Sequence, residues 1–282
     1  MKPDTHGVVV STVRRDPEEL AQLTDPLDVH HRTYRYAASA GLTDLLRRFW
    51  IPVWSVPPGK ETPQRTLQDP ACLVVISGGY ARFYGVAPEL STTTLTGDGW
   101  AVGLVLAPAA GHTIAGRAGT LNDRYADLEE VLGDDGRDLT DRVRALMAPD
   151  PHDPAAHRAA MRACEDILRR FLPLDADGEL LNAVVAAVEN NGALLQVAQI
   201  CERFGIGERA LQRLLRRRLG LTPKCLIQRR RLQEAAERLR RENVTQAELA
   251  AAVGYADQSH MIRDFLHVTG TTPGRFIAAQ RS

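Results

Sequence analysis

The sequence has few aromatic residues, few cysteines and no long apolar run. Phenylalanine, tryptophan and tyrosine make up 5% of its 282 residues, and the four cysteines, Cys72, Cys164, Cys201 and Cys225, form no CxxC pair. This scatter argues against a disulfide framework and a structural zinc site, and it favours a reducing compartment. Runs such as Leu73–Ile76 are too short to cross a bilayer, and the first residues do not resemble a signal peptide. We expect a cytoplasmic protein with no membrane association, bound metal or cofactor.

The chain also lacks net charge, because it contains 35 Lys and Arg residues against 35 Asp and Glu residues. This balance conceals two halves of opposite sign. Residues 180–282 contain 16 basic and 9 acidic residues, a net charge of +7, which leaves −7 for residues 1–179. Such asymmetry indicates that the C-terminal part can meet a polyanion such as nucleic acid, whereas the acidic part would not. The length is sufficient for two domains.

The first part of the chain is typical of a β-rich domain followed by helices. The first thirty residues show no periodicity and are expected to form an irregular arm. From His31 to about Arg117, short apolar runs alternate with Pro, Gly and Asp, which predicts a barrel or sandwich with one helix at Leu42–Phe49. The expected strands are Trp50–Val56, Cys72–Ser77, Ala81–Val86, Ser91–Leu95, Trp100–Leu106 and His112–Ala115, and the expected helices are Leu121–Leu132, Leu139–Met147 and Ala155–Phe171.

Beyond Gly178 every segment has helical spacing, so we expect a boundary between residues 1–178 and an all-α domain of residues 179–282. The predicted helices are Leu180–Asn190, Leu194–Phe204, Glu208–Leu219, Pro223–Arg240, Gln246–Val253 and Gln258–Val268.

This helical part contains an internal repeat with an offset of 49 to 50 residues. Each copy has a helix, a glycine that can adopt a left-handed turn, and an amphipathic helix closed by another glycine, which is a helix-turn-helix. We expect Asp257 to cap the second helix of the second copy. The segments Ile200–Gly205, Leu211–Leu215 and Gly220–Pro223 recur as Leu249–Gly254, Met261–Phe265 and Gly270–Pro273.

The second helix of each copy should bury an apolar stripe and expose polar side chains. The stripes are Leu211, Leu214 and Leu215 in the first copy and Met261, Ile262, Phe265 and Val268 in the second. Arg and Gln are the side chains that read guanine and adenine edges in the major groove. The linker Pro223–Arg240, at 1.5 Å per residue, would be about 27 Å long, close to the roughly 34 Å of one turn of DNA. Both helices could therefore enter successive major grooves.

Residues from about Leu180 to Arg281 resemble the DNA-binding domain of the AraC/XylS family of bacterial transcription regulators. The resemblance depends on the order and spacing of the twin motif, Arg231–Ala235 in the linker, Gly254–Ser259 and the closing Gly270–Phe276. The chain departs from the family at Leu215, where an aromatic residue is common, and at Ile277, where an arginine is common. The resemblance implies base contacts by Arg209, Gln212, Arg213, Gln258, Ser259, His260 and Arg263.

Two arginine runs suit phosphate contacts, which position a protein on DNA without specifying sequence. They are Arg216, Arg217 and Arg218 in the first reading helix, and Arg229 and Arg230 in the linker. The alternative for both runs is a solvated helix face. Arg231 is a candidate for a structural ion pair with an acidic residue.

The N-terminal half resembles the degenerate, cupin-like sensor region found in front of this domain in many AraC relatives, which implies a β-barrel. Trp54, Tyr80, Tyr84 and Trp100 are candidates for a ligand pocket, although aromatic residues at strand spacing are more often core. His30, His31 and His112 lack the pattern of a metal cupin.

We therefore expect an α+β two-domain protein that is a transcription regulator and not an enzyme. Its expected partners are double-stranded DNA, RNA polymerase, a small-molecule effector, and a second copy bound through Ala155–Phe171, unless that helix packs within its own chain. The alternatives are a metal- or ligand-dependent cupin-like enzyme tethered to DNA, and a constitutive DNA binder without an effector.

Overall fold

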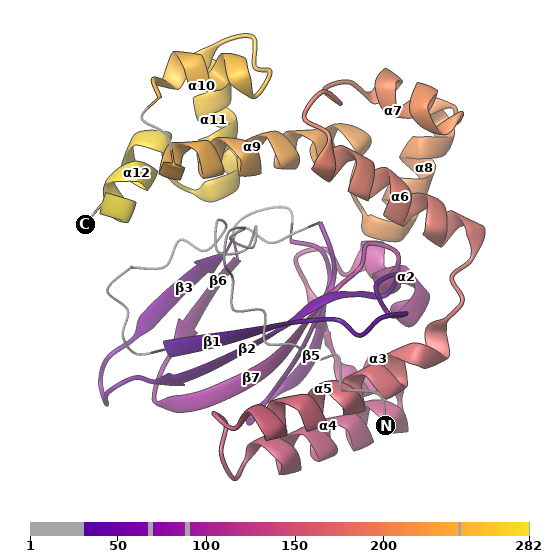
Figure 1. Ribbon diagram of the computed structural model, residues 1–282, viewed down its shortest axis with the longest axis vertical. Helices are drawn as coiled ribbons and strands as arrows, with labels where there is room; N and C mark the ends of the chain where they lie inside the picture. The colour runs from indigo at the N-terminus through magenta and orange to yellow at the C-terminus, as the bar shows by residue number, and fades with distance from the viewer. Residues whose placement is uncertain (1–30, 67–69, 88–90, 242–243, 282) are drawn as a thin grey trace.

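The computed structural model describes residues 31–66, 70–87, 91–241 and 244–281 (Figure 1). The expected N-terminal arm and His30 lie outside these residues. The described chain consists of a β-rich N-terminal domain and a helical C-terminal domain, so the predicted α+β two-domain fold is confirmed. The predicted boundary falls in the first turn of α6 (Ala176–Asn190).

The N-terminal domain has two antiparallel sheets. The larger sheet has the order β1-β2-β7-β4-β5-β8, and the smaller pairs β3 with β6. Within the described residues the sheets do not close into a barrel, because β1 and β8 each pair with one strand only. The strands are β1 (His31–Ala37), β2 (Leu46–Ser55), β3 (Thr62–Thr66), β4 (Leu73–Ser77), β5 (Ala81–Tyr84), β6 (Ser91–Leu95), β7 (Asp98–Leu106) and β8 (Tyr125–Asp127).

The expected helix at Leu42–Phe49 is wrong, although its apolar residues are all buried. Leu42 and Leu45 lie in a turn, and β2 begins at Leu46. A bulge between Leu46 and Arg48 inserts one residue into the strand. Leu46 and Phe49 therefore face the same core three residues apart, a spacing that resembles a helix in the sequence.

The expected strand at His112–Ala115 is also wrong, because these residues belong to helix α2 (Ala110–Ala115), which ends at left-handed Gly116. Gly111 lets this helix pack closely on Cys72, which directly precedes β4, since a Cβ at position 111 would overlap the sulfur of Cys72. The expected helix at Leu121–Leu132 is shorter than predicted, because β8 precedes it. The remaining elements of the N-terminal domain are η1 (Ala118–Thr120), α3 (Leu128–Leu132), α4 (Asp134–Met147), α5 (Pro154–Leu168) and η2 (Arg169–Phe171).

The C-terminal domain follows the predicted order of helices closely. The first reading helix has the predicted bounds, because Gly207 precedes it and left-handed Gly220 ends it. A last helix, α12, was not expected. The elements after α6 are α7 (Val197–Phe204), α8 (Glu208–Leu219), α9 (Pro223–Arg241), α10 (Gln246–Ala252), α11 (Gln258–Thr269) and α12 (Pro273–Arg281).

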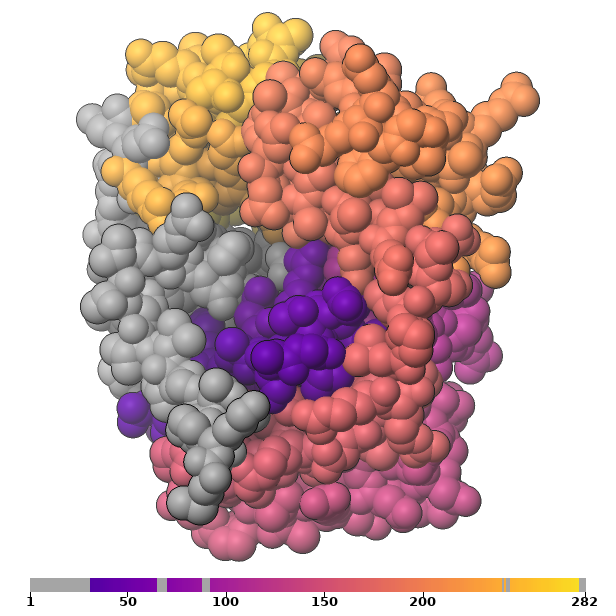
Figure 2. Space-filling view, turned by 45° about the vertical axis from the view of Figure 1, so that its right-hand side comes forward, coloured from indigo at the N-terminus to yellow at the C-terminus, as the bar shows by residue number. Residues whose placement is uncertain are grey.

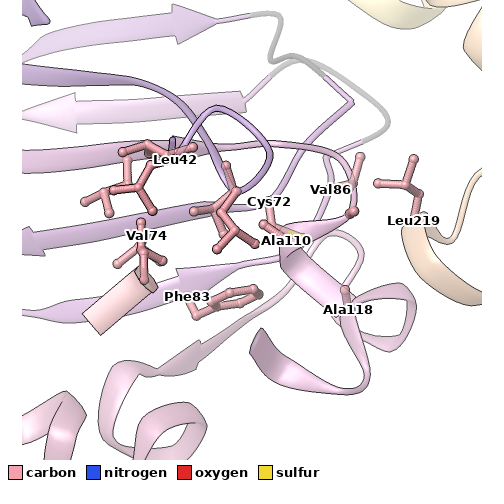
Figure 3. Packing of buried hydrophobic residues seen from close by; sticks show 14 of the residues in the cluster. Leu42, Cys72, Val74, Phe83, Val86, Ala110, Ala118 and Leu219 are labelled. Atoms are coloured by element: carbon pink, nitrogen blue, oxygen red, sulfur yellow. The ribbon is translucent and has the colours of Figure 1, made fainter. Parts of the chain in front are cut away.

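Two large clusters of buried side chains support these elements, and a third, small cluster lies on the other face of the larger sheet. The largest lies between the sheet and α4 and α5, which run beneath it in Figure 1, and continues without a break into α6, α7, α8 and the start of α9. In Figure 3, Leu219 of α8 faces Val86 and Ala118 of the N-terminal domain. The second large cluster contains the rest of α9 and helices α10 to α12. The first helix-turn-helix thus shares the core of the N-terminal domain, with α8 in contact with α2 and η1, and Figure 2 shows the C-terminal domain packed against the N-terminal domain.

No helix among the described residues is both long enough and apolar enough to cross a membrane.

Candidate nucleic-acid interface

The first helix-turn-helix consists of α7, a turn at Gly205 and the reading helix α8. Gly205 has a φ of 61°, a left-handed conformation that glycine adopts without steric cost. The Gln199 side chain accepts a hydrogen bond from the Gln196 N–H at 2.9 Å, which fixes the start of α7. The predicted stripe is buried, with Leu211 and Leu215 fully inaccessible and Leu214 8% exposed.

The second helix-turn-helix repeats this geometry with α10, a turn at Gly254 (φ 79°) and the reading helix α11. Thr245 and Glu248 form a capping box at the start of α10. The predicted cap of α11 is confirmed, since the Asp257 carboxylate accepts from the His260 N–H at 2.8 Å. Met261 and Phe265 are buried, and Ile262 is half-buried.

The side chains predicted to contact bases lie on the outer faces of these two helices. On α8, positions 209, 212, 213 and 216 follow helical spacing and share one face. The Gln212 amide donates to Glu208 Oε1 at 3.0 Å, and the Gln258 amide donates to Gln246 Oε1 at 3.1 Å. All seven predicted base contacts are exposed: Arg209, Gln212, Arg213, Gln258, Ser259, His260 and Arg263.

Four arginines on α8 carry positive charge that no described acidic side chain neutralises. Arg209, Arg213, Arg216 and Arg217 are exposed, and none of them forms an ion pair within the described part of the chain. An uncompensated row of guanidinium groups on an exposed helix is the charge pattern that attracts DNA phosphates. Phosphate contacts by Arg216 and Arg217 stay a prediction, with which the exposure of both side chains agrees.

The predicted phosphate contact by Arg218 is wrong in this structure, because its side chain is only 4% exposed. Arg218 is seven residues after Leu211 and so lies on the buried face of α8. Its guanidinium donates to Asp175 Oδ2 at 2.6 Å and to Asp177 Oδ2 at 3.4 Å. The hydrogen bond from Arg218, followed by that from the Gly178 N–H, lowers the pKa of Asp175. Nothing in the spacing of the sequence predicted these two partners.

The predicted phosphate contacts by Arg229 and Arg230 are wrong for the same reason. Both side chains are buried, at 2% and 6% exposure, and both donate to groups of this chain. Arg231 forms no ion pair with any acidic side chain that the structure describes. It donates to the backbone carbonyls of Val253 and Gly254 and lies 3.8 Å above the ring of Tyr255.

The aromatic residues predicted to line one pocket lie on two faces of the larger sheet. Trp54, Tyr80 and Tyr84 pack around one small cluster, whereas Trp100 packs against the main core on the opposite face. Trp54 lies flat on the sheet because Gly99 has no side chain, and a Cβ there would overlap the indole. The predicted pocket is therefore wrong for Trp100, and the other three residues share a surface.

Of the histidines considered as metal ligands, the structure describes His31 and His112. Burial, then the charges of Arg218 and Arg217, lower the pKa of His112, which lies beside the C-terminal domain. Within the ranges that the structure describes, no three His, Cys, Asp or Glu side chains are placed to hold a metal ion.

Helix α5, proposed from the sequence as a dimer interface, packs its apolar stripe within its own chain. Cys164 and Leu168 belong to the main core, and His157 Nδ1 lies 2.7 Å from the hydroxyl of Tyr36. A homodimer stays a prediction, and the buried face of α5 is not available to it.

Two family matches cover different parts of the chain. Residues 200–279 match a family described as "Helix-turn-helix domain". Residues 34–127 match a family described as "Domain of unknown function (DUF6597)".

Curated relatives match about a third of this chain. The HTH-type transcriptional activator RhaR of Cronobacter sakazakii is 30% identical over 98 residues, which are 34% of this chain and 35% of RhaR. The activator RhaS of Escherichia fergusonii is 32% identical over 94 residues, 33% of this chain and 34% of RhaS. The chain therefore matches about a third of the length of these relatives.

A solved structure of a transcriptional regulator from Chromobacterium violaceum, described as AraC-type, is 23% identical to this chain, with a TM-score of 0.35. The match includes 36% of this chain and 92% of the regulator. The twin helix-turn-helix geometry and the matches over residues 200–279 agree with the resemblance seen in the sequence. The C-terminal domain is therefore similar to helix-turn-helix domains of transcriptional activators, and its membership of the AraC family stays a prediction.

Proposed function

We propose that this chain is a sequence-specific DNA-binding transcription regulator. The observation that carries the proposal is the pair of helix-turn-helix units on one continuous helix, with every predicted base-contacting side chain exposed. Helix α9 has 19 residues, so at 1.5 Å per residue it is about 28 Å long, near the roughly 34 Å that separates successive major grooves. Helices α8 and α11 would then read adjacent grooves on one face of the duplex.

The N-terminal domain would control how these two helices are presented. A ligand that binds one arrangement of this domain better than another shifts the population toward that arrangement. Trp54, Tyr80 and Tyr84 are half-buried on one sheet face, and they are the residues we propose for an effector. Contact with RNA polymerase, homodimer formation and a cytoplasmic location belong to the same proposal.

Selection of genomic fragments by the purified full-length chain, in competition with random duplex at physiological salt, tests the function. Footprinting of the retained fragments should show protection over about two turns of DNA in two adjacent major grooves. Retention without any preferred site, with or without small-molecule extracts, would contradict the proposal. A preferred site bound equally with and without such extracts would favour a constitutive binder.

A further inference from the structure

Three consecutive arginines of α9 contact three different parts of the molecule. Arg229 Nη1 donates to the carbonyl of Ala87, just after β5 of the N-terminal domain, at 2.6 Å. Arg230 Nη2 donates to the carbonyl of Gly192, in the loop before the first helix-turn-helix, at 3.2 Å. Arg231 Nε donates at 2.8 Å to the carbonyl of Val253, in the turn of the second one. We call Arg229, Arg230 and Arg231 the arginine junction.

The arginine junction lies where α9 passes from one hydrophobic cluster to the other. Ile227, two residues before the junction, belongs to the cluster shared with the N-terminal domain. Leu232, directly after it, belongs to the cluster of the second helix-turn-helix. The polar contacts of the junction therefore bridge the two cores at the point where their apolar packing changes.

Burying Arg229 and Arg230 is unfavourable unless their donors are satisfied. Burial lowers the pKa of Arg230, and Glu234, one turn along α9, opposes this effect with an ion pair at 2.7 Å. The planar guanidinium presents its donors in a fixed fork, so it constrains the direction as well as the distance of each partner. Carbonyl acceptors held in this way define the position of a loop on α9.

The contact of Arg231 extends to the second reading helix. Its guanidinium stacks on Tyr255, whose hydroxyl donates to Asp264 Oδ2 of α11 at 3.0 Å. His260 Nε2, on the exposed face of α11, is 3.6 Å from the same oxygen. The turn of the second helix-turn-helix also packs on the loop before the first one, since a Cβ on Gly254 would lie 2.9 Å from the side chain of Leu195.

The contact of Arg229 extends to the sheet. Ala87 is three residues after Tyr84, which lies on the face proposed for an effector. Between them Gly85 is packed so tightly that a Cβ would overlap the carbonyl of Leu121. Asn122, which follows Leu121 in the chain, donates from its side-chain amide to the carbonyl of Gly220 at 3.2 Å. Gly220 ends α8. A displacement of Tyr84 would therefore act on both α8 and α9.

We propose that the arginine junction sets the distance and rotation between the two reading helices, and that Arg229 makes this geometry depend on the N-terminal domain. The three arginines are then positioning residues for DNA recognition, and they do not touch DNA. This inference rests on the proposed function, because spacing matters only if both helices read one site.

Binding to operators of altered spacing tests the proposal. The selected DNA site is rebuilt with two or five base pairs inserted between its halves, which turns the second half by roughly 70° or by half a turn. The wild-type chain should prefer the natural spacing by about tenfold or more, equivalent to about 1.4 kcal/mol. Arg230→Gln and Arg231→Gln should reduce this preference to about twofold while the preferred bases of each half stay the same. Arg231→Lys should behave like Arg231→Gln, since lysine lacks the fork.

The control is Arg162→Gln, which removes a positive charge from the exposed face of α5, outside the C-terminal domain. It should keep the wild-type spacing profile. Folding of each variant is checked by circular dichroism and by its thermal midpoint. Wild-type spacing preference in folded Arg230→Gln and Arg231→Gln would overturn the proposal, as would loss of preference in the control.

A second measurement remains informative if no specific DNA site exists. Pairs of spin labels report the distance between two parts of the molecule. They are attached to cysteines introduced two at a time at the exposed positions Asp141, Ala198 and Ala247, in a chain whose Cys201 and Cys225 are replaced by serine. The buried Cys72 and Cys164 stay unlabelled, because burial raises the pKa of each thiol to about 12.

Arg231→Gln should broaden the distribution of distances between labels at positions 198 and 247. Position 198 lies in α7 of the first helix-turn-helix and position 247 in α10 of the second. Arg229→Gln should broaden the distribution between positions 141 and 247 and leave the first pair unchanged. Unchanged distributions in both variants would overturn the junction. Changed distributions with no preferred DNA would instead support the junction and contradict the proposed function.

Discussion

Arg217 and Arg218 are neighbours on α8, and their replacement by alanine should have opposite consequences. Arg217 is exposed and forms no ion pair within the described residues, whereas Arg218 is 4% exposed and contacts two aspartates. If the assignment of their roles is correct, Arg217→Ala weakens DNA binding without affecting the fold. Arg218→Ala then weakens the fold without removing a phosphate contact.

The magnitude for Arg218→Ala follows from the exposure of its partners. Removing one partner of a wholly buried ion pair costs about 3–5 kcal/mol. Here the side chains of Asp175 and Asp177 are 63% and 55% exposed, so water solvates them when the arginine is absent. The cost then reduces to that of hydrogen bonds to a charged group, about 1–3 kcal/mol. For Arg217→Ala, an exposed substitution, the free energy of unfolding should change by less than about 0.5 kcal/mol.

Two assays separate the residues. Urea denaturation gives the free energy of unfolding, and fluorescence anisotropy over a series of salt concentrations gives the salt slope of DNA binding. Arg217→Ala should lower the slope by about 0.9, the value for one lost phosphate contact. Arg218→Ala should leave the slope unchanged. A reduced slope in Arg218→Ala, or a stability loss above 1 kcal/mol in Arg217→Ala, would refute the assignment.

Three further predictions concern other parts of the molecule. Arg213→Ala should cost about 1–3 kcal/mol of binding and relax specificity at one base position, as measured by selection from randomised sites; equal losses on specific and random duplex would contradict a base contact. Thr245→Ala removes the cap on the Glu248 N–H and should destabilise by about 1 kcal/mol in urea denaturation, with Gln246→Ala as the neighbouring control. The pKa of Asp175 is lowered by Arg218, so its contribution is present above its ordinary pKa of 3.8 and is lost as pH falls through the lower folded value. Thermal midpoints of the wild type and Asp175→Asn should therefore converge in acid, and a constant difference down to pH 3 would argue against this linkage.

The reading helices could be predicted from the sequence because local signals define them. Glycine at each end of α8, together with leucines at helical spacing, gives its bounds and its exposed face. The fate of Arg218 could be predicted only in part. Its seven-residue offset from Leu211 indicates the buried face, but its partner Asp175 is 43 residues earlier in the chain. Periodicity places a residue on a helix, and tertiary packing decides what lies opposite.

The β-rich domain was less predictable from the sequence, because its strands are defined by pairing between residues that are far apart in the chain. The bulge in β2 gives Leu46 and Phe49 a helical spacing, and only their pairing with β7 shows that they belong to a strand. Trp54 and Trp100 differ by an even number of positions, yet they lie on different strands and face opposite sides of the sheet. Assigning a face to a residue requires the strand register, which the sequence does not contain.

The continuity of the main core has a consequence for building chimeric regulators. A cut at the expected boundary, between residues 178 and 179, would separate α6 and Leu219 from Val86 and leave apolar surface bare on both fragments. A chimera that takes its β-rich N-terminal domain from a relative should therefore take the first helix-turn-helix from the same relative. The second helix-turn-helix, from Leu232 onward, has a hydrophobic cluster of its own. Replacing it should therefore expose less apolar surface than replacing the β-rich domain. A recombinant with altered half-site preference would then be easier to obtain than one that responds to a new signal.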